Sequence, residues 1–130
     1  MEATGEADTI LVVDDHIDTC EVMRLMLEGE GYRVATAHDG REALMLLFGG
    51  LKPCVIVMDL TMPVMNGVEF RAEQLKHATI ASIPFIAYSA VDDVRDSAPQ
   101  LRAADYIDKP SELRHVLSII RQHCNHELSR

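Results

Sequence analysis

The sequence predicts an α/β fold in which five helices surround a doubly wound, five-stranded parallel sheet. Short apolar runs alternate along the chain with amphipathic segments of helical spacing, and this β-α-β alternation repeats five times. The run 54–58 is almost wholly apolar, as expected for a central parallel strand that is covered on both faces. The length of 130 residues suits one domain with a single buried core.

The first half of the chain predicts two strand–helix pairs. A strand at 10–13 is followed by a helix whose apolar residues recur at helical spacing and which stops at Gly29. A second strand is predicted at 32–36. Asp39 and Gly40 then begin a helix that ends at 49–50, because glycine is common just after the last turn of a helix.

The second half continues the alternation. After the central strand at 54–58, Pro63 and the pair 66–67 mark a turn before a third helix that runs through Leu75. A fourth strand at 83–88 precedes a weakly patterned helix at 91–102, and the fifth strand contains 106–107. Ser111 can cap a final helix. The apolar residues of that helix are Leu113, Val116, Leu117, Ile119 and Ile120.

The composition argues against several classes of function. The net charge of −9 disfavours nonspecific nucleic-acid binding and docking on an anionic membrane. The first eight residues lack the apolar core of a signal peptide, and no apolar run approaches transmembrane length. We therefore expect a cytoplasmic protein whose domain spans 9–124, between a flexible or disordered N-terminus at 1–8 and a tail at 125–130.

The cysteines are few and scattered. Cys20, Cys54 and Cys124 are odd in number, so no disulfide framework is expected. Cys54 falls in the expected buried strand, where a reduced thiol behaves as a small hydrophobic side chain. His123 and Cys124 resemble metal ligands, but with a single thiolate between them they are interpreted as an exposed helix end.

Side chains of the types that enzymes use in phosphoryl transfer follow four of the predicted strands. Asp14 and Asp15 end the first run, Asp59 ends the third, Ser89 ends the fourth, and Lys109 follows the fifth. The carboxyl ends of parallel strands meet at one edge of a sheet, where ligands bind. Three crowded carboxylates repel one another unless a cation lies among them, and Mg²⁺ suits oxygen ligands with several retained waters.

This set of residues predicts a phosphoryl-transfer site. A carboxylate beside Mg²⁺ can attack a phosphoryl group and form an acyl phosphate. The metal, the Lys109 ammonium and the Ser89 hydroxyl would neutralise the oxygens of the transferred group. Because the chain has no P-loop, the donor is not expected to bind as a nucleotide. His16 follows the acid pair and is given no role.

Four segments in this order resemble the receiver domain of bacterial two-component response regulators. They are 11–15, 58–67, 88–90 and 105–110, and the resemblance spans nearly the whole chain, from about residue 9 to 124. It implies a flavodoxin-like fold, as in a single-domain chemotaxis regulator. It also implies that Asp59 accepts a phosphoryl group from a sensor histidine kinase or a histidine phosphotransfer protein. Asp14, Asp15 and Asp59 would hold Mg²⁺ together with the backbone carbonyl of Thr61.

The resemblance also assigns a switch. Ser89 and Tyr106 match the family's switch pair, and Lys109 would pair with a phosphoryl oxygen across a cis Lys109–Pro110 bond. The expected function is a phosphorylation-dependent signalling switch that alters its contacts with an unidentified downstream protein. Such a switch is no enzyme beyond assisting its own phosphorylation and dephosphorylation. A homodimer remains open.

Two other interpretations remain open. The chain could be a docking module that works without phosphorylation. It could also be a haloacid-dehalogenase-type phosphotransferase, a family that uses an Asp nucleophile with Mg²⁺. That family requires a second Asp two residues after the nucleophile, and this chain has Thr61 there.

The segment before the fifth strand departs from the family pattern. Pro99 falls in the expected fourth helix, where proline belongs only in the first turn. Arg102 stands where the family usually has a glycine that ends this helix. We expect the chemistry to be retained while the partner surface is atypical. Val91 is apolar and cannot orient an attacking water, which predicts slow self-dephosphorylation.

Overall fold

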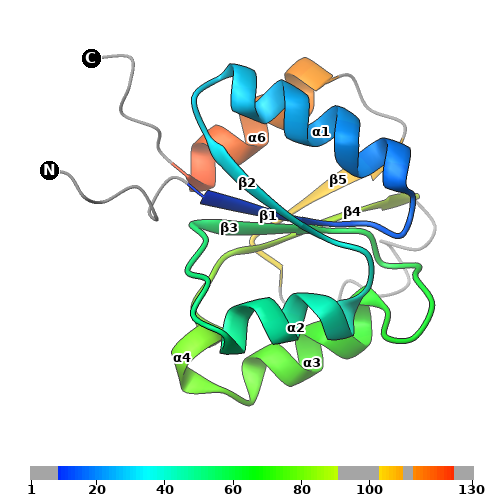
Figure 1. Ribbon diagram of the computed structural model, residues 1–130, viewed down its shortest axis with the longest axis vertical. Coiled ribbons are helices and arrows are strands. Elements are labelled where there is room, and N and C mark those ends of the chain that lie inside the picture. Colours follow the sequence, from blue (N-terminus) through cyan, green and yellow to red (C-terminus); the bar gives the residue numbers. More distant parts are fainter. Residues whose placement is uncertain (1–8, 91–102, 110–112, 125–130) are drawn as a thin grey trace, which may run out of the picture.

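A computed structural model describes residues 9–90, 103–109 and 113–124, and these contain a five-stranded parallel sheet (Figure 1). The strands lie in the order β2-β1-β3-β4-β5, which confirms the predicted doubly wound fold class. Their bounds are Thr9–Val13 for β1, Arg33–Ala37 for β2, Val55–Met58 for β3, Phe85–Ala90 for β4 and Asp105–Lys109 for β5.

Helices cover both faces of this sheet. One face carries α1 (Ile17–Gly29) and α6 (Leu113–His123), and the other carries α2 (Gly40–Phe48), α3 (Gly67–Leu75) and the short α4 (Ala78–Ala81) (Figure 1). The expected helix at 91–102, the cap at Ser111 and both chain ends lie outside the described residues. Within the described parts of the chain, no helix is long and apolar enough to cross a membrane.

The apolar side chains of β1 pack into two hydrophobic cores, one on each face of the sheet. Leu11 and Val13 pack with residues of α2, α3 and α4, while Ile10 and Val12 pack with residues of α1 and α6. This follows from strand geometry, because successive side chains point to opposite faces of the sheet. Every residue of β1 and of β3 is buried, as predicted for central parallel strands.

Side-chain caps fix the beginnings of two helices. Asp39, predicted to begin α2, accepts a hydrogen bond from the backbone N–H of Glu42 at 2.8 Å. At α3, the Asn66 side chain accepts from the N–H of Glu69 at 2.8 Å, and the Glu69 carboxylate accepts from the N–H of Asn66 at 3.0 Å. The pair 66–67, predicted as a turn, is therefore the start of α3.

The structure contradicts the prediction that the cysteines stay unpaired. Cys54 forms a disulfide with Cys124, with their Cα atoms 5.4 Å apart and a sequence separation of 70. Cys54 comes directly before β3 and Cys124 directly after α6. The bond therefore ties the end of the last helix to the central part of the sheet. Cys20 of α1 is a buried thiol outside this disulfide, and its Sγ–H donates to the backbone carbonyl of Asp14 at 3.2 Å.

The end of α6 is buried, which corrects its interpretation as an exposed terminus. Cys124 is 2% exposed, and its carbonyl accepts a hydrogen bond from the Tyr32 hydroxyl at 3.0 Å. His123 Nε2 lies 3.2 Å from Asp105 Oδ2. The apolar stripe of α6 predicts only that the helix is buried. It does not predict which part of the sheet the last turn meets.

Candidate functional site

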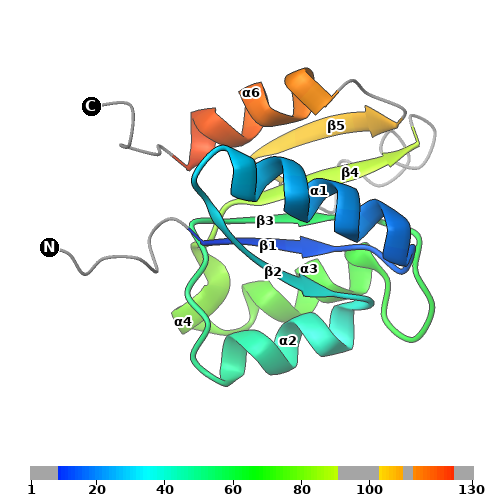
Figure 2. The same ribbon diagram turned by 45° about the horizontal axis from the view of Figure 1, so that its top comes forward.

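The carboxyl ends of three strands bring predicted site residues to one edge of the sheet. The last residues of β1 and β3 pair with each other, and Met58 of β3 pairs with Ala87 of β4. Asp14 and Asp59 therefore follow directly after paired positions. Ser89 lies two residues beyond Ala87, so its side chain is on the same face of β4. Figure 2 shows the strand arrows running toward this edge.

Asp59 is fixed by hydrogen bonds from neighbouring segments. Its backbone N–H donates to the carbonyl of Val13 at 2.9 Å. Its Oδ1 accepts from the N–H of Thr61 at 3.0 Å and from the Ser89 hydroxyl at 3.2 Å. The residue is 4% exposed. A carboxylate that is held this firmly keeps one orientation, which a nucleophile needs.

Asp14, Asp15, His16 and Asp59 form a cluster, named here the acidic cluster. Each offers one ligand atom, and these atoms all lie within 4.8 Å of one another. Asp15 Oδ1 is buried and makes no hydrogen bond within the described part of the chain. A buried carboxylate oxygen without a hydrogen bond is costly unless a cation balances it. Three carboxylates at this spacing supply the oxygen ligands that Mg²⁺ prefers, so these residues fit that ion.

The remaining predicted residues belong to β5. Tyr106 pairs with Ala87 of β4, is half-buried, and packs against the core formed with α2, α3 and α4. The backbone of Lys109 pairs with Ala90, so the main chain of β5 reaches the edge that carries the acidic cluster. The Lys109 side chain and the bond to Pro110 lie outside the described residues.

His16 belongs to the acidic cluster, although no role is predicted for it from the sequence. Its Nδ1 lies 3.0 Å from Asp14 Oδ1 and 3.4 Å from Asp15 Oδ1. Its backbone N–H also donates to Asp14 Oδ1, at 2.9 Å. The one signal in the sequence is its position directly after the acid pair. That position does not tell on which side of the turn the ring lies.

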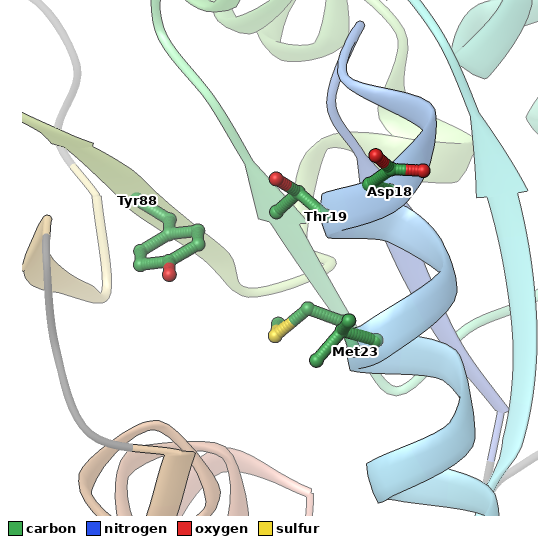
Figure 3. A pocket seen from close by; sticks show the side chains of 5 residues that line it. Asp18, Thr19, Met23 and Tyr88 are labelled. Atoms are coloured by element: carbon green, nitrogen blue, oxygen red, sulfur yellow. The ribbon is translucent and has the colours of Figure 1, made fainter.

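A separate apolar pocket of about 240 Å³ lies between α1 and β4. Its lining residues are Asp18, Thr19, Val22, Met23 and Tyr88. Figure 3 shows the Tyr88 ring facing Thr19 and Met23 across the pocket. With one carboxylate and no basic side chain in this lining, it lacks the ligand set of the acidic cluster.

The loop after Asp59 holds one strained residue. Val64 has φ 68°, and its side chain is 72% exposed. A β-branched residue in this left-handed region costs roughly 1–2 kcal/mol, whereas asparagine adopts the region more readily. We expect Val64→Asn to raise the free energy of unfolding by about 1 kcal/mol, measured from the midpoint of urea unfolding.

The matched control for Val64→Asn is Val22→Asn. Val22 is also exposed, at 49%, but it lies inside α1, where no residue has a positive φ. The control variant should gain no stability. Equal effects of the two substitutions would contradict the assignment of strain to Val64.

Comparisons with known proteins agree with this geometry. The sequence matches the family described as response regulator receiver domain over residues 10–121. An uncharacterized 14.6 kDa protein of Leptolyngbya boryana is 38% identical over 127 residues, covering 95% of each chain. Response regulator MprA of Mycolicibacterium vanbaalenii is 38% identical over 114 residues, covering 86% of this chain and 48% of that protein. The chain thus spans about half the length of MprA.

Solved structures give the same result. The signal receiver domain of a histidine kinase from Syntrophus aciditrophicus superposes with a TM-score of 0.82 at 27% identity, covering 95% of this chain and 94% of that one. The response regulator TrrA of Thermotoga maritima, described in complex with Mg(2+)-BeF, has a TM-score of 0.78 at 28% identity. The match covers 88% of this chain and 97% of that one. The receiver domain of a sensor histidine kinase from Pseudomonas aeruginosa is described with a magnesium ion coordinated in the active site cleft. Its TM-score is 0.82 at 26% identity, and the match covers 92% of this chain and 98% of that one.

Receiver domains are regulatory switches that histidine kinases phosphorylate, and they bind Mg²⁺ in an acidic pocket. In this chain an acidic cluster lies at the carboxyl ends of the strands of a doubly wound sheet. The family match and the 38% identity of two relatives extend over most of the sequence. The chain therefore belongs to the receiver domain family of two-component response regulators.

Proposed function

We propose that this chain is a phosphorylation-dependent signalling switch that accepts a phosphoryl group on Asp59 and thereby changes its contacts with another protein. The observation that carries the proposal is the fixed, buried Asp59 carboxylate inside a cluster with Asp14 and Asp15. The switch unit is proposed to span 9–124. The donor would be the phosphohistidine of a sensor histidine kinase or of a histidine phosphotransfer protein.

In the proposed transfer, the N–P bond of the phosphohistidine breaks and a bond forms between phosphorus and an Asp59 carboxylate oxygen. The imidazole leaves and takes up a proton. Asp14, Asp15, Asp59 and the carbonyl of Thr61 would hold Mg²⁺, which when bound supplies positive charge next to the transferred group. The Thr61 N–H and the Ser89 hydroxyl orient the nucleophile, since both donate to Asp59 Oδ1.

The switch step uses the same hydroxyl. Ser89 donates to Asp59 Oδ1 in the structure. Once Asp59 carries a phosphoryl group, the negative charge lies on the phosphoryl oxygens. The Ser89 hydroxyl would then form a stronger hydrogen bond by donating to one of these oxygens, because hydrogen bonds to charged acceptors are stronger. Tyr106 pairs with Ala87, two residues before Ser89. A shift of Ser89 would therefore bias the arrangement of the half-buried ring, which is a population shift between two states. Lys109 would pair with a phosphoryl oxygen from the end of β5.

The alternatives have less support. The haloacid-dehalogenase interpretation needs an acid at position 61, and there the Thr61 backbone N–H donates to Asp59. A docking module that ignores phosphorylation would not need three carboxylates gathered at one point, two of them buried, since their repulsion costs stability without a cation.

Intact-mass measurement after incubation with acetyl phosphate tests the proposed function. We expect a Mg²⁺-dependent gain of one phosphoryl group in the wild type, its loss in Asp59→Asn, and its release by hydroxylamine, which cleaves acyl phosphates. Asp18→Asn is the matched control, because Asp18 is an exposed carboxylate of α1 outside the acidic cluster. A wild-type protein without an adduct, or an adduct that persists in Asp59→Asn, would refute the proposal.

A further inference from the structure

The acidic cluster contains a nitrogen ligand as well as oxygen ligands. His16 Nδ1 lies 3.0 Å from Asp14 Oδ1, and all four ligand atoms of the cluster lie within 4.8 Å of one another. A cation among the three carboxylates would therefore have an imidazole nitrogen within the same small volume. The chemistry of a site depends on this ligand, because imidazole binds first-row transition metal ions much better than Mg²⁺.

We propose that His16 is a metal ligand in this chain and that it gives the site a preference for Mn²⁺ and Co²⁺ over Mg²⁺. The inference rests on the proposed function, since it concerns the cation site of the same acidic cluster. It goes beyond that function in predicting which divalent ions the site selects. A site made of oxygen ligands alone would discriminate less strongly between Mg²⁺ and these ions.

The position of His16 supports a ligand role. Its backbone N–H donates to Asp14 Oδ1 at 2.9 Å, which holds the residue in a tight turn next to the carboxylate. The contrast is His38, whose Nδ1 lies 3.5 Å from the single carboxylate of Glu42 on the exposed start of α2. His38 is not among the residues of the acidic cluster. Both histidine side chains are exposed, His16 at 68% and His38 at 45%, so His38 is a matched comparison for a histidine beside one acid instead of three.

The Oδ1 atom of Asp15 is also buried beside the His16 ring, although the Asp15 side chain as a whole is 30% exposed. This oxygen makes no hydrogen bond within the described residues, although His16 Nδ1 is 3.4 Å away. Without a cation, the tautomer with its hydrogen on Nδ1 can donate to Asp14 Oδ1, 3.0 Å away, because an ionised carboxylate oxygen only accepts. With a cation, the ring hydrogen would lie on Nε2 and the Nδ1 lone pair would face the ion.

Electron paramagnetic resonance of Mn²⁺ tests this inference without measuring phosphorylation. Free Mn²⁺ gives a sharp six-line spectrum that weakens on binding, so a titration yields the Mn²⁺ affinity, and competition with Mg²⁺ yields the Mg²⁺ affinity. Spin-echo modulation of the bound Mn²⁺ then detects a directly coordinated ¹⁴N nucleus. The variants are His16→Asn and His38→Asn. Asparagine can still donate to Asp14 but supplies no imidazole nitrogen.

We expect ¹⁴N modulation in the wild type and in His38→Asn, and its loss in His16→Asn. The Mn²⁺ affinity of His16→Asn should fall by about tenfold or more, since loss of even an outer partner of a metal site commonly costs this much. The Mg²⁺ affinity should change much less, so the Mn²⁺ to Mg²⁺ affinity ratio falls. Modulation that is absent from the wild type, or that persists in His16→Asn, would overturn the inference, as would an unchanged affinity ratio.

Failure of the proposed function gives a different result. A wild-type protein that binds Mn²⁺ through His16 but gains no phosphoryl group from acetyl phosphate would support this inference and refute the proposed function. A protein that is phosphorylated on Asp59 and binds Mn²⁺ without ¹⁴N modulation would support the function and overturn the ligand role of His16.

Discussion

Replacement of Gly67 by alanine is expected to lower the free energy of unfolding by about 1–3 kcal/mol, the usual cost of forcing extra volume into a packed site. A Cβ atom at this position would lie 2.8 Å from Leu60 Cδ2, 2.9 Å from the Asp59 carbonyl oxygen and 2.9 Å from Leu60 Cα. Two of these three atoms are backbone atoms, which cannot turn away as a side chain can. The urea midpoint measures the loss of stability.

The same substitution should also slow phosphorylation by acetyl phosphate. Gly67 donates its N–H to the carbonyl of Leu60 at 3.1 Å, so α3 begins directly against the segment that carries Asp59. Relief of the clash requires a shift of the Asp59–Leu60 backbone. A small displacement of a nucleophile can cost a large factor in rate.

Gly29→Ala is the matched control for Gly67→Ala. A Cβ atom at Gly29 meets no atom within 4 Å, and the residue lies in the last turn of α1. Alanine favours helix over glycine by about 0.5–1 kcal/mol, so this variant should be as stable as the wild type or more stable. Equal stability and equal labelling of the two alanine variants would contradict the steric argument.

The position of the acidic cluster could be predicted because it depends on sheet topology alone. Apolar runs that end at Asp14 and Asp59 predict strands, and parallel strands bring their carboxyl ends to one edge. A shift of one residue in the register would turn every side chain to the other face, and burial on both faces of β1 and β3 prevents such a shift. The placement of Ser89 beside Asp59 follows from the same constraint.

The features that the sequence did not predict depend on local geometry or on distant packing. The cap at Asn66 resembles an ordinary turn in the sequence, because Asn-Gly is common in both settings. The positive φ of Val64 contradicts the preference of valine, so only the loop's attachment to α3 and β3 can impose it. The pairing of Cys54 with Cys124 depends on where α6 ends against the sheet, and no local pattern encodes that.

Reduction of the disulfide between Cys54 and Cys124 is expected to lower the free energy of unfolding by about 4 kcal/mol. The disulfide joins residues with a sequence separation of 70. For a loop of that length, the lost entropy of the unfolded chain corresponds to a stabilisation of about 4 kcal/mol. Urea unfolding of the oxidised and the reduced protein measures the difference. The reduced protein should stay folded at low urea, because Val116, Ile119 and Ile120 of α6 remain packed in the core and the Tyr32 hydroxyl still donates to the Cys124 carbonyl.

Two variants separate the disulfide from other effects of a reducing agent. Cys54→Ala combined with Cys124→Ala removes the bond, so its stability should not respond to reductant. Cys20→Ala keeps the bond, so its stability should fall on reduction by the same amount as in the wild type. Three reactive thiols in the unfolded, unreduced wild type would contradict the bond; one thiol is expected.

Phosphorylation should be insensitive to this reduction, because the disulfide and the acidic cluster lie at opposite ends of β3. Cys54 precedes the strand and Asp59 follows it, and five residue steps of an extended strand span roughly 16 Å. Thr61 and Ser89 donate to the Asp59 side chain, the Asp59 backbone N–H donates to Val13, and none of these three hydrogen bonds involves Cys54 or α6. We therefore expect equal labelling by acetyl phosphate before and after reduction at low urea. Labelling that changes while the protein stays folded would show that the end of α6 is coupled to the acidic cluster through the sheet.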